Sequence, residues 1–449
     1  MPATDGSADG LEPAPTERPG AAGMPRRMAL GAAAFGAVTA LAAGCGPVGA
    51  AAAAQRLAAR SGPSPAGTAG GAATPPASFN VRSFGAAGNG STDDTGPIQA
   101  AIGAATEAGG GRVLLSAGRY AITGIQLATG VDLQGEGRDN TVLRYTSPSG
   151  NVVTVASVGF NRLADFQITF AQRQSAGAAI YLDKAFTIDI DSVFIQGNNQ
   201  LAYDGIVLHE STATFIRDFN VYGCQGDAVL VEGPTGNDAY LQGGIINLGQ
   251  TTSGAGVHIL NFGAGAVNIT DVDILTGEYS LLVQNSNYLR FENTYFDSSS
   301  RGAVLESGHL ITFANCWFSN RPGPGLHVGA VQGCSVVGGQ AANCAGHGIH
   351  ITDSAQYVSL AAVQVIGNNT GGQGADGILV DSGASYVTIQ GCLVGNNPGV
   401  FGGPGQQVGI HVSSTAGTPY ALIGNMLFGN VTAPVLDHGQ GGYVAGNLS

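Results

Sequence analysis

The sequence has few charged residues, and the shortage is greatest for basic ones. Lysine and arginine together account for 17 of the 449 residues, Lys184 is the single lysine, and neither type occurs after Arg321. Aspartate and glutamate number 30, so the formal net charge is −13. Binding to nucleic acid needs basic side chains that contact phosphates, so we expect no nucleic-acid partner. A polyanionic substrate would also be repelled unless a cation or a local arginine helped, which favours a neutral polymer.

Cysteine is scarce and irregularly spaced. Beyond Cys45 the chain has five cysteines, an odd number that argues against a complete set of disulfide bonds in an exported protein. None has the paired spacing of zinc ligands. We therefore predict no metal site and no resident cofactor, and expect most of these cysteines to be small buried residues. They are Cys224, Cys316, Cys334, Cys344 and Cys392.

Long apolar runs are missing except for one close to the N-terminus. Arg26 and Arg27 precede the apolar residues 28–44, a run with the length of a signal-peptide core that is short for a membrane-spanning helix. The arginine pair resembles a twin-arginine export signal, and "LAAGC" resembles a lipobox ending at Cys45. Cys45 is the residue that would be lipidated, and plain signal cleavage nearby is the alternative.

These features divide the chain into three parts. Residues 1–45 are predicted to be an export signal, residues 46–77 a flexible tether rich in alanine, glycine and proline, and residues 78–449 a single folded domain. The predicted location is extracellular or on the cell surface, with membrane contact only through a lipid at Cys45. No oligomeric state is predicted.

Glycine, in contrast, is abundant, and part of it marks an internal repeat. The chain has 73 glycines, and a short pattern of glycine, apolar residue, any residue and apolar residue recurs along it. Copies begin 23 residues apart at Gly256, Tyr279 (without the glycine), Gly302, Gly325 and Gly348. Each copy is usually followed by a second strand-like segment with alternating apolar residues, and no helical pattern intervenes. A short strand repeat without helices predicts an all-β fold, a parallel β-helix solenoid.

One helix is predicted, ahead of the repeats. Within residues 78–120, the stretch "TDDTGPIQAAIGAATEAGGG" offers Thr92, Asp93 or Asp94 as the N-cap, and Gly109–Gly111 as the end. A solenoid needs a cover for its apolar end, so this helix is predicted to cap the N-terminal coil.

The N-terminal part of the domain resembles a known group of proteins. The stretches "FNVRSFGAAGNGSTDDTGPIQAAI", "GGGRVLLSAGRYAIT" and "GVDLQGEGRDNTVLRY" are similar to the start of the pectate-lyase-like superfamily of right-handed β-helices. That superfamily includes polygalacturonases, rhamnogalacturonases, epimerase-like proteins and phage tailspike depolymerases. The resemblance implies a right-handed coil and a polysaccharide partner, but the superfamily hosts several reactions and non-enzymatic binders.

Comparison with the polygalacturonase motifs implies two catalytic carboxylates. Asp204 and Asp227 occupy the positions of two motif aspartates one coil apart, whereas Gly226 and Ala255 replace a third aspartate and the motif histidine. Equivalent positions on adjacent coils are about 4.8 Å apart. Two such carboxylates should separate their pKa values, and this short spacing suits a retaining glycosidase.

The alternatives remain open at this stage. An aspartate before a glycine is common in tight turns, where it caps backbone amides, and this role for both Asp204 and Asp227 would count against hydrolysis. A polysaccharide lyase is the second enzymatic interpretation, and it alone would call for calcium or arginine to neutralise a uronate. A non-catalytic glycan-binding or adhesive module is the third interpretation, favoured by the incomplete motifs.

Substrate-binding residues are predicted on the second strand of successive coils. Asp191, Arg217 and Glu292 share one outward position, and Arg290 lies two residues earlier on the same face. They form a candidate sugar-binding groove, with solvated surface charge as the alternative. Exposed tyrosines that precede second strands could stack on sugars or be structural. They are Tyr288, Tyr357 and Tyr386.

The outward side of the glycine-containing strand carries several histidines. The alignment gives His258, Leu281, Val304, His327 and His350 in successive coils. No carboxylate repeats beside His327 and His350, so this column is interpreted as a packed or sticky face rather than a metal site. A glycine–histidine–glycine at His347 lacks the neighbours of the polygalacturonase motif and is interpreted as a turn.

Overall fold

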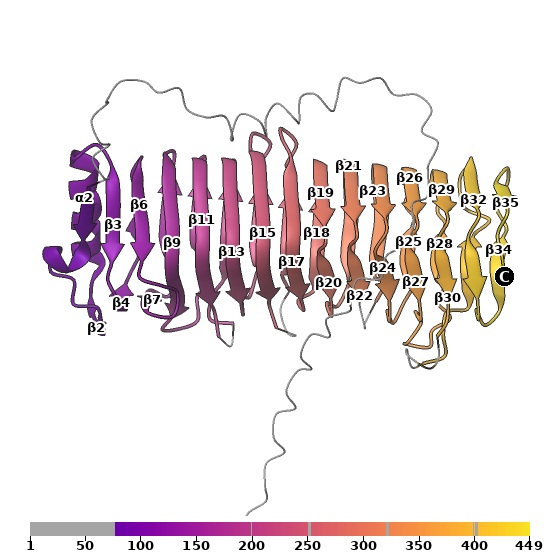
Figure 1. Cartoon of the computed structure of the whole chain (residues 1–449), viewed down its shortest axis with the longest axis horizontal. Coiled ribbons are helices and arrows are strands. Elements are labelled where there is room, and N and C mark those ends of the chain that lie inside the picture. Colours follow the sequence, from indigo (N-terminus) through magenta and orange to yellow (C-terminus); the bar gives the residue numbers. More distant parts are fainter. Residues whose placement is uncertain (1–76, 199, 250–252, 320–322, 398, 400–402) are drawn as a thin grey trace, which may run out of the picture. The chain divides into compact units, whose positions relative to one another are not determined.

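A computed structural model describes residues 77–198, 200–249, 253–319, 323–397, 399 and 403–449. The predicted export signal, Cys45 and all but the last residue of the predicted tether lie outside these residues. The described chain winds into a parallel β-solenoid of about 14 turns with one α-helix (Figure 1). The predicted all-β solenoid is therefore confirmed.

Each full coil contributes to three parallel ladders, because a strand pairs with its counterpart in the next coil. In the first ladder, Ile206 of one coil pairs with Val229 of the next, and Val229 with Val257. The first ladder contains β5 (Ile125–Gln126), β8 (Val153–Ala156), β10 (Ala178–Asp183), β12 (Asp204–His209), β14 (Val229–Glu232), β16 (Ala255–Leu260), β18 (Tyr279–Gln284), β25 (Ile349–Ile351), β28 (Ile378–Val380), β31 (Val408–Val412), β34 (Ala433–Asp437) and the first halves of β21 (Ala303–Ala314) and β23 (Leu326–Val337).

The second and third ladders follow in each coil. The second contains β1 (Ser78–Asn80), β3 (Gly111–Leu115), β6 (Val131–Gly135), β19 (Ser286–Glu292), β26 (Gln356–Ala361), β29 (Ser385–Gln390), β32 (Tyr420–Ile423), β35 (Tyr443–Ala445) and the second halves of β21 and β23. The third contains β2 (Asn89–Asp93), β4 (Gly118–Ile122), β7 (Thr141–Tyr145), β20 (Tyr295–Asp297), β22 (Trp317–Ser319), β24 (Gln340–Ala342), β27 (Gln364–Ile366), β30 (Leu393–Gly395) and β33 (Met426–Phe428). Five strands bend from the second into the third, namely β9 (Gly159–Phe170), β11 (Phe186–Gln196), β13 (Thr212–Tyr222), β15 (Asn237–Asn247) and β17 (Val267–Leu275).

The core is a continuous column of apolar side chains inside the coils. Alternation along each strand sends every second residue inward, as in β16, where Val257 and Ile259 are fully buried and His258 points outward. Aromatic rings stack inside the column from coil to coil, with 4.7 Å between the ring centroids of Phe291 and Phe313. The five cysteines after Cys45 are buried, as expected.

The corner between the second and third ladders depends on residues that accept positive φ angles. Asp and Asn tolerate this left-handed region better than other residues with side chains, because their short polar side chains can bond to nearby backbone. Successive coils place such residues at the corner, and they include Asp165 (φ 63°), Asp218 (47°), Asp271 (57°), Asn293 (48°) and Asn315 (53°).

One coil is shifted relative to the sequence alignment. The repeat pattern aligned Leu281 with His258, whereas the structure pairs His258 with Leu282, and Leu282 with Val304. Leu281 instead points into the core and is fully buried. The run "LLV" at residues 281–283 has no polar residue to mark its outward side, so hydrophobic alternation alone could not assign the register.

The predicted helix is present at the N-terminal end of the solenoid (Figure 1). Helix α2 (Thr95–Glu107) begins after Asp94 and buries Ile98, Ala101, Ile102 and Ala105, which join the core column. The Asp94 carboxylate accepts hydrogen bonds from the amides of Ala87 and Gly88, so it ties the preceding loop to the helix start.

Candidate functional site

The two predicted catalytic carboxylates lie on adjacent coils of the first ladder. Asp204 begins β12, and Asp227 lies two residues before β14. Ile206 pairs with Val229, so the two aspartates occupy equivalent positions one coil apart. The structure thus brings these residues together as the sequence alignment implied.

Each carboxylate also caps a backbone amide of the following coil. The Asp227 amide donates to Oδ1 of Asp204 at 2.9 Å, and the Ala255 amide donates to Oδ1 of Asp227 at 2.7 Å. One oxygen of each side chain therefore has the structural role that was the alternative to catalysis. Gly226 is required beside them, because a Cβ at this position would lie 2.2 Å from Oδ1 of Asp204.

The second oxygen of Asp227 contacts His258, on the coil that follows. His258 Nδ1 lies 2.8 Å from Asp227 Oδ2, and His258 Nε2 lies 3.0 Å from Oε1 of Gln284. The Gln284 amide nitrogen donates to Glu306, which fixes the orientation of the amide with its oxygen toward His258. Both ring nitrogens thus face acceptors, an arrangement that suits the protonated imidazolium.

The pKa values of this cluster follow from its surroundings. Burial and, to a lesser extent, the neighbouring charge of Asp227 together raise the pKa of Asp204 to about 7, although the hydrogen bond from the Asp227 amide acts in the opposite direction. Burial alone would lower the pKa of His258, but the hydrogen bond and charge of Asp227 outweigh it and raise the pKa. Asp204 can therefore hold a proton close to neutral pH.

His258 is the site residue that the sequence comparison missed. The comparison looked for a histidine at the position of Ala255, three residues earlier. The signal was present, because His258 was recognised as an outward residue of its strand. Its distance to Asp227 depends on the coil stacking and on the rotamer, which a motif search does not capture. We refer to Asp204, Asp227 and His258 as the first cluster.

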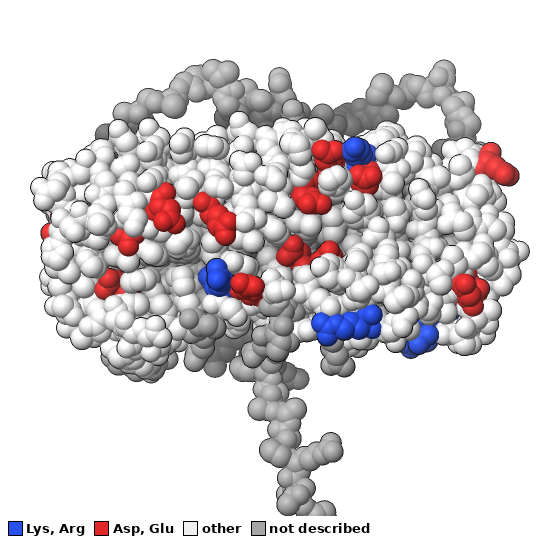
Figure 2. All heavy atoms as spheres, turned by 180° about the vertical axis from the view of Figure 1, so that it is seen from behind, with Lys and Arg blue, Asp and Glu red and all other residues white. Residues whose placement is uncertain are grey.

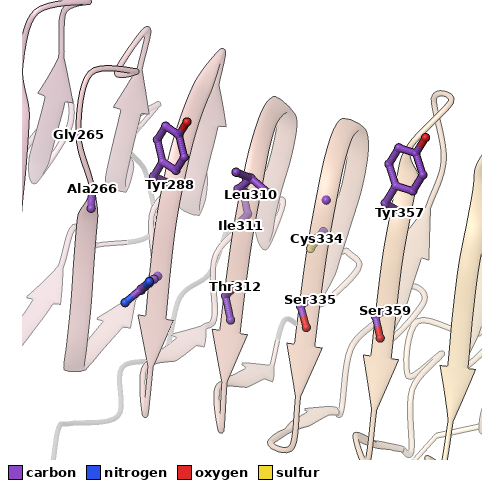
Figure 3. Close-up of a pocket in the computed structure, with 12 residues that line it drawn as sticks. Gly265, Ala266, Tyr288, Leu310, Ile311, Thr312, Cys334, Ser335, Tyr357 and Ser359 are labelled. Carbon is purple, nitrogen blue, oxygen red and sulfur yellow. The ribbon is translucent and has the colours of Figure 1, made fainter. Parts of the chain in front are cut away.

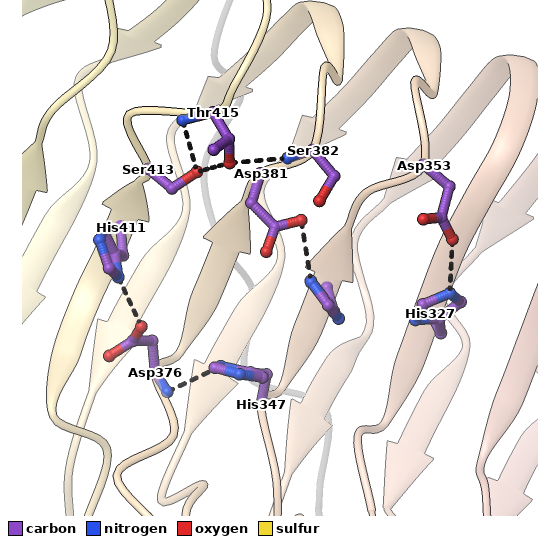
Figure 4. A network of polar contacts seen from close by, with 10 residues as sticks. His327, His347, Asp353, Asp376, Asp381, Ser382, His411, Ser413 and Thr415 are labelled. Carbon is purple, nitrogen blue, oxygen red and sulfur yellow. Dashed lines mark hydrogen bonds and ion pairs between the residues drawn. The ribbon is translucent and has the colours of Figure 1, made fainter.

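A second cluster repeats this geometry six coils further along the first ladder. The Asp376 amide donates to Nδ1 of His347 at 2.9 Å, the Val408 amide donates to Oδ1 of Asp376 at 3.0 Å, and His411 Nδ1 lies 2.8 Å from Asp376 Oδ2 (Figure 4). The register positions match those of the first cluster, with His347 in place of Asp204. We refer to His347, Asp376 and His411 as the second cluster.

The remaining histidines of this region each face one acid. His327 Nε2 lies 3.7 Å from an oxygen of Asp353, and His350 Nε2 lies 3.3 Å from an oxygen of Asp381 (Figure 4). Burial lowers the pKa of His327 and of His347, and the nearby His350 lowers both further. Within the described residues, no three or more His, Cys, Asp or Glu side chains are arranged to hold a metal ion.

The predicted substrate-binding residues lie on the second ladder. Arg217 forms an ion pair with Asp189 across adjacent coils, and Asp191 forms one with Arg162 at 2.7 Å. Arg290 is exposed and lines a shallow groove, and Glu292 is exposed at the end of the same strand, β19.

These four residues and the first cluster therefore belong to different ladders. Asp191, Arg217, Arg290 and Glu292 pair along the second ladder, whereas the strands that follow Asp204 and Asp227 pair along the first. The structure does not place the six predicted residues in one compact site.

One face of the solenoid carries little charge. Seen from behind relative to Figure 1, most of the solenoid is uncharged, with separate acidic side chains and fewer basic ones (Figure 2). No helix in the described part of the chain is both long and apolar enough to cross a membrane.

Two protein families match the chain. The rhamnogalacturonase A/epimerase, pectate-lyase-like family matches residues 78–327, which is more than half of the chain. The right-handed β-helix region family matches residues 255–426. No curated protein sequence matches the chain.

Solved structures with a similar fold come from bacteria and phages. The A-module of the mannuronan C-5 epimerase AlgE6 of Azotobacter vinelandii is 17% identical, with a TM-score of 0.53, over 83% of this chain and 99% of that one. Tailspike protein 3 of bacteriophage CBA120 is 16% identical, with a TM-score of 0.64, over 82% of this chain and 61% of that one. The N-terminal fragment of gene product 12 of bacteriophage phi29 is 14% identical, with a TM-score of 0.57, over 82% and 71%. At these identities the likeness is one of fold.

Proposed function

The chain belongs to the rhamnogalacturonase A/epimerase, pectate-lyase-like family, and from this membership we propose that it processes a polysaccharide outside the cell. Glycoside hydrolysis is the reaction that the first cluster supports best. The observation that carries the proposal is the position and pKa of Asp204, a half-buried carboxyl whose pKa is raised to about 7 beside a second carboxylate.

Asp204 is the general acid in this proposal. Its Oδ1 accepts the Asp227 amide, while no hydrogen bond to its Oδ2 is found among the described residues. A protonated carboxyl with a free oxygen can donate to the glycosidic oxygen as the bond to the sugar carbon breaks. The charge of Asp227 favours this protonated form, because two adjacent carboxylates resist ionising together.

Asp227 is the second carboxylate, and His258 is its positioning residue. Both oxygens of Asp227 accept a hydrogen bond, yet each keeps a further lone pair toward which an attacking water or sugar carbon can approach. The imidazolium of His258 fixes the carboxylate and balances its charge. Asp204 then supplies the acid and Asp227 the second carboxylate, which is the division of labour that glycoside hydrolysis requires.

The location outside the cell is part of the proposal and rests on the N-terminal sequence. Arg26, Arg27 and the following apolar run supply export, and a lipid on Cys45 retains the protein at the membrane surface. The variant Cys45→Ala should move the protein from the membrane fraction to the medium. An unchanged distribution on cell fractionation would remove the lipid anchor from the proposal.

The test of hydrolysis uses the full chain and a set of neutral and acidic polysaccharides. New reducing ends without ultraviolet-absorbing products are expected, and Asp204→Asn should lower the rate about 10²–10⁴-fold. The rate should also fall as the pH rises above about 7, because Asp204 then loses its proton. Asp376→Asn is the matched control, since it makes the same change at the middle aspartate of the second cluster, the counterpart of Asp227, and it should leave the rate unchanged.

Two results would redirect the proposal. Ultraviolet-absorbing unsaturated products would assign a lyase, and calcium dependence would then be the next measurement. Retention of activity in Asp204→Asn would remove the general-acid role.

A non-catalytic glycan-binding module is the second candidate function, and a specific observation favours it. The second cluster reproduces the contacts of the first without a pair of carboxylates. The aspartate–amide–histidine arrangement therefore occurs as a structural feature of this solenoid. Binding of a polysaccharide without cleavage, unchanged in Asp204→Asn, would support this second function.

A further inference from the structure

A shallow groove lies on the second ladder, over β19, β21, β23 and β26. The first cluster lies on a different ladder, the first. The volume of the groove is about 530 Å³. Tyr288 and Tyr357 stand in the upper part of the groove with Leu310 between them, and the small polar side chains of Thr312, Ser335 and Ser359 lie lower on the strands (Figure 3). The lining residues are Gly265, Ala266, Tyr288, Arg290, Leu310, Ile311, Thr312, Gly333, Cys334, Ser335, Tyr357 and Ser359.

The upper row of the groove consists of equivalent residues in successive coils, each with a positive φ angle. Tyr288, Leu310, Gly333 and Tyr357 follow one another in register, with φ values of 59°, 57°, 85° and 57°. The two tyrosines and Leu310 are more than half exposed. Gly333 leaves a gap before Tyr357, so the two rings stand three coils, or about 14 Å, apart.

Large exposed aromatic rings need an explanation when they are aligned. Tyr357 stacks on Tyr386 of the next coil, with 4.8 Å between ring centroids, and this contact fixes the orientation of the Tyr357 ring. Among the described contacts, Tyr288 has no such aromatic partner. Exposed rings at both ends of a groove offer flat apolar faces, which is how aromatic side chains commonly line ligand sites.

The lower row supplies hydrogen-bonding groups at coil spacing. Arg290, Thr312, Ser335 and Ser359 pair in register and point to the same side of the ladder. Hydroxyl groups repeated about every 4.8 Å can donate to and accept from the hydroxyls of a chain that runs along the solenoid axis.

The charge of the groove differs from that of the whole chain. The formal net charge is −13, yet no acidic residue lines the groove. Arg162 and Arg217 on the same ladder are ion-paired, whereas the side chain of Arg290 has no hydrogen bond or ion pair within the described residues. The nearest acid along its strand is Glu292, two residues further on. Arg290 is therefore available to an anionic group of a ligand.

We propose that this groove binds an acidic polysaccharide, with sugar faces on Tyr288 and Tyr357 and a sugar carboxylate at Arg290. The chain would lie along the solenoid axis, and the hydroxyls of Thr312, Ser335 and Ser359 would contact the sugars between. The groove holds the polymer on the second ladder, away from the first cluster. Only the statement that the polymer bound here is also the polymer that is cleaved rests on the proposed function.

The test is affinity electrophoresis of the full chain in gels that contain polygalacturonate, alginate or hyaluronan, each beside its carboxyl-reduced form. The substitution Asp204→Asn is present throughout to prevent cleavage. Tyr288→Ala and Tyr357→Ala should each weaken binding at least about tenfold. Arg290→Gln should weaken binding to the acidic polymers about tenfold and leave the carboxyl-reduced forms unaffected.

Two further variants keep the result interpretable. Tyr443→Ala removes an exposed ring on β35, outside the groove, and should not change binding. Gly333→Asn fills the gap with a residue that tolerates positive φ, and it should block binding while the tyrosines remain. Thermal melting of each variant confirms that it folds.

The outcomes separate this inference from the proposed function. Binding that persists in Tyr288→Ala and Tyr357→Ala overturns the proposal that this groove binds the polysaccharide. Self-association of the chain that these variants abolish also overturns it, because a second copy would then be the occupant. Absence of cleavage by the chain without Asp204→Asn, together with tyrosine-dependent binding, contradicts the hydrolase and supports the groove.

Discussion

The coils with Asp204, Asp227 and His258 and the coils with His347, Asp376 and His411 place polar side chains at the same three register positions. In both, the middle aspartate caps an amide of the next coil and contacts a histidine there. The shared contacts belong to the architecture of the solenoid. The chemistry must therefore lie in what differs.

Two differences separate the clusters. The first position holds a carboxyl with a pKa raised to about 7 in the first cluster, and an imidazole in the second that accepts a backbone amide and has a lowered pKa. The histidine at the third position contacts Gln284 in the first cluster, and no equivalent partner of His411 Nε2 is found among the described residues. A proton close to neutral pH is thus available at Asp204 and not at His347.

The largest expected effect comes from exchanging the first positions. Asp204→His gives the first cluster the composition of the second, and hydrolysis should fall about 10²–10⁴-fold, because an imidazole that accepts the Asp227 amide is neutral and its remaining N–H is too weak an acid to protonate the glycosidic oxygen. Release of reducing ends measures this. His347→Asp is the reciprocal variant and should leave the rate within about twofold. An active Asp204→His variant would show that the two clusters do not differ in chemistry.

The second-largest effect is on the free energy of unfolding. Here we expect the middle aspartate of the second cluster to contribute more than that of the first cluster. Asp376 is 7% exposed at its side chain and Asp227 is 17% exposed. Replacing either with alanine leaves a buried amide and the Nδ1 atom of a histidine without a partner, which costs about 1–3 kcal/mol of the free energy of unfolding. Asp376→Ala should lie at the upper end and Asp227→Ala at the lower end in urea unfolding. The reverse ranking would contradict a mainly structural second cluster.

A smaller effect is the dependence of stability on pH. The pKa of Asp204 is raised from 3.8 to about 7 in the folded chain, so the folded chain binds the extra proton and its stability falls as the pH rises from about 4 to 7. The loss should be on the order of 1–2 kcal/mol, since the carboxyl keeps some contact with solvent. Urea unfolding at several pH values should show this loss in the unaltered chain and in Asp376→Asn, and its absence in Asp204→Asn. A loss that persists in Asp204→Asn would assign it to another group.

The smallest effect is on the pKa of His258. Gln284→Met removes the acceptor at Nε2, so the pKa of His258 should fall by less than about one unit. Titration of the histidine ring signals by NMR measures the shift, and His411 serves as the internal control. An unchanged His258 with a shifted His411 would contradict the contacts that distinguish the clusters.

Most of the fold follows from the sequence, because a repeat of strands has one simple solution. Glycine and asparagine corners and alternating aliphatic residues predict the coils, and the residues around Asp93 and Asp94 predict the helix. The exception is the coil at Tyr279, where several consecutive aliphatic residues hide the outward side. There the register depends on packing against Ala255 and Val304, which no local pattern contains.

The candidate site was predictable only in part, for a related reason. Asp204 and Asp227 could be found because each precedes its strand at a fixed position of the repeat. His258 reaches Asp227 from the fourth residue of another strand, β16, so their contact depends on coil spacing and side-chain rotamers. The likeness between Asp227 and Asp376 was likewise hidden, because the partners of Asp376 lie 29 and 35 residues away in sequence.

Because the coils stack at a constant spacing, the place of a residue in the sequence determines its place along the solenoid axis. Six coils separate the two clusters, which corresponds to about 29 Å. Each coil contacts mainly its neighbours, so loss or gain of one whole coil would move everything beyond it by about 4.8 Å and leave each site intact. The spacing between any two sites along the axis is thus a whole number of coil spacings. The distance between two polymer-binding sites on the solenoid can therefore change in evolution only in steps of one coil.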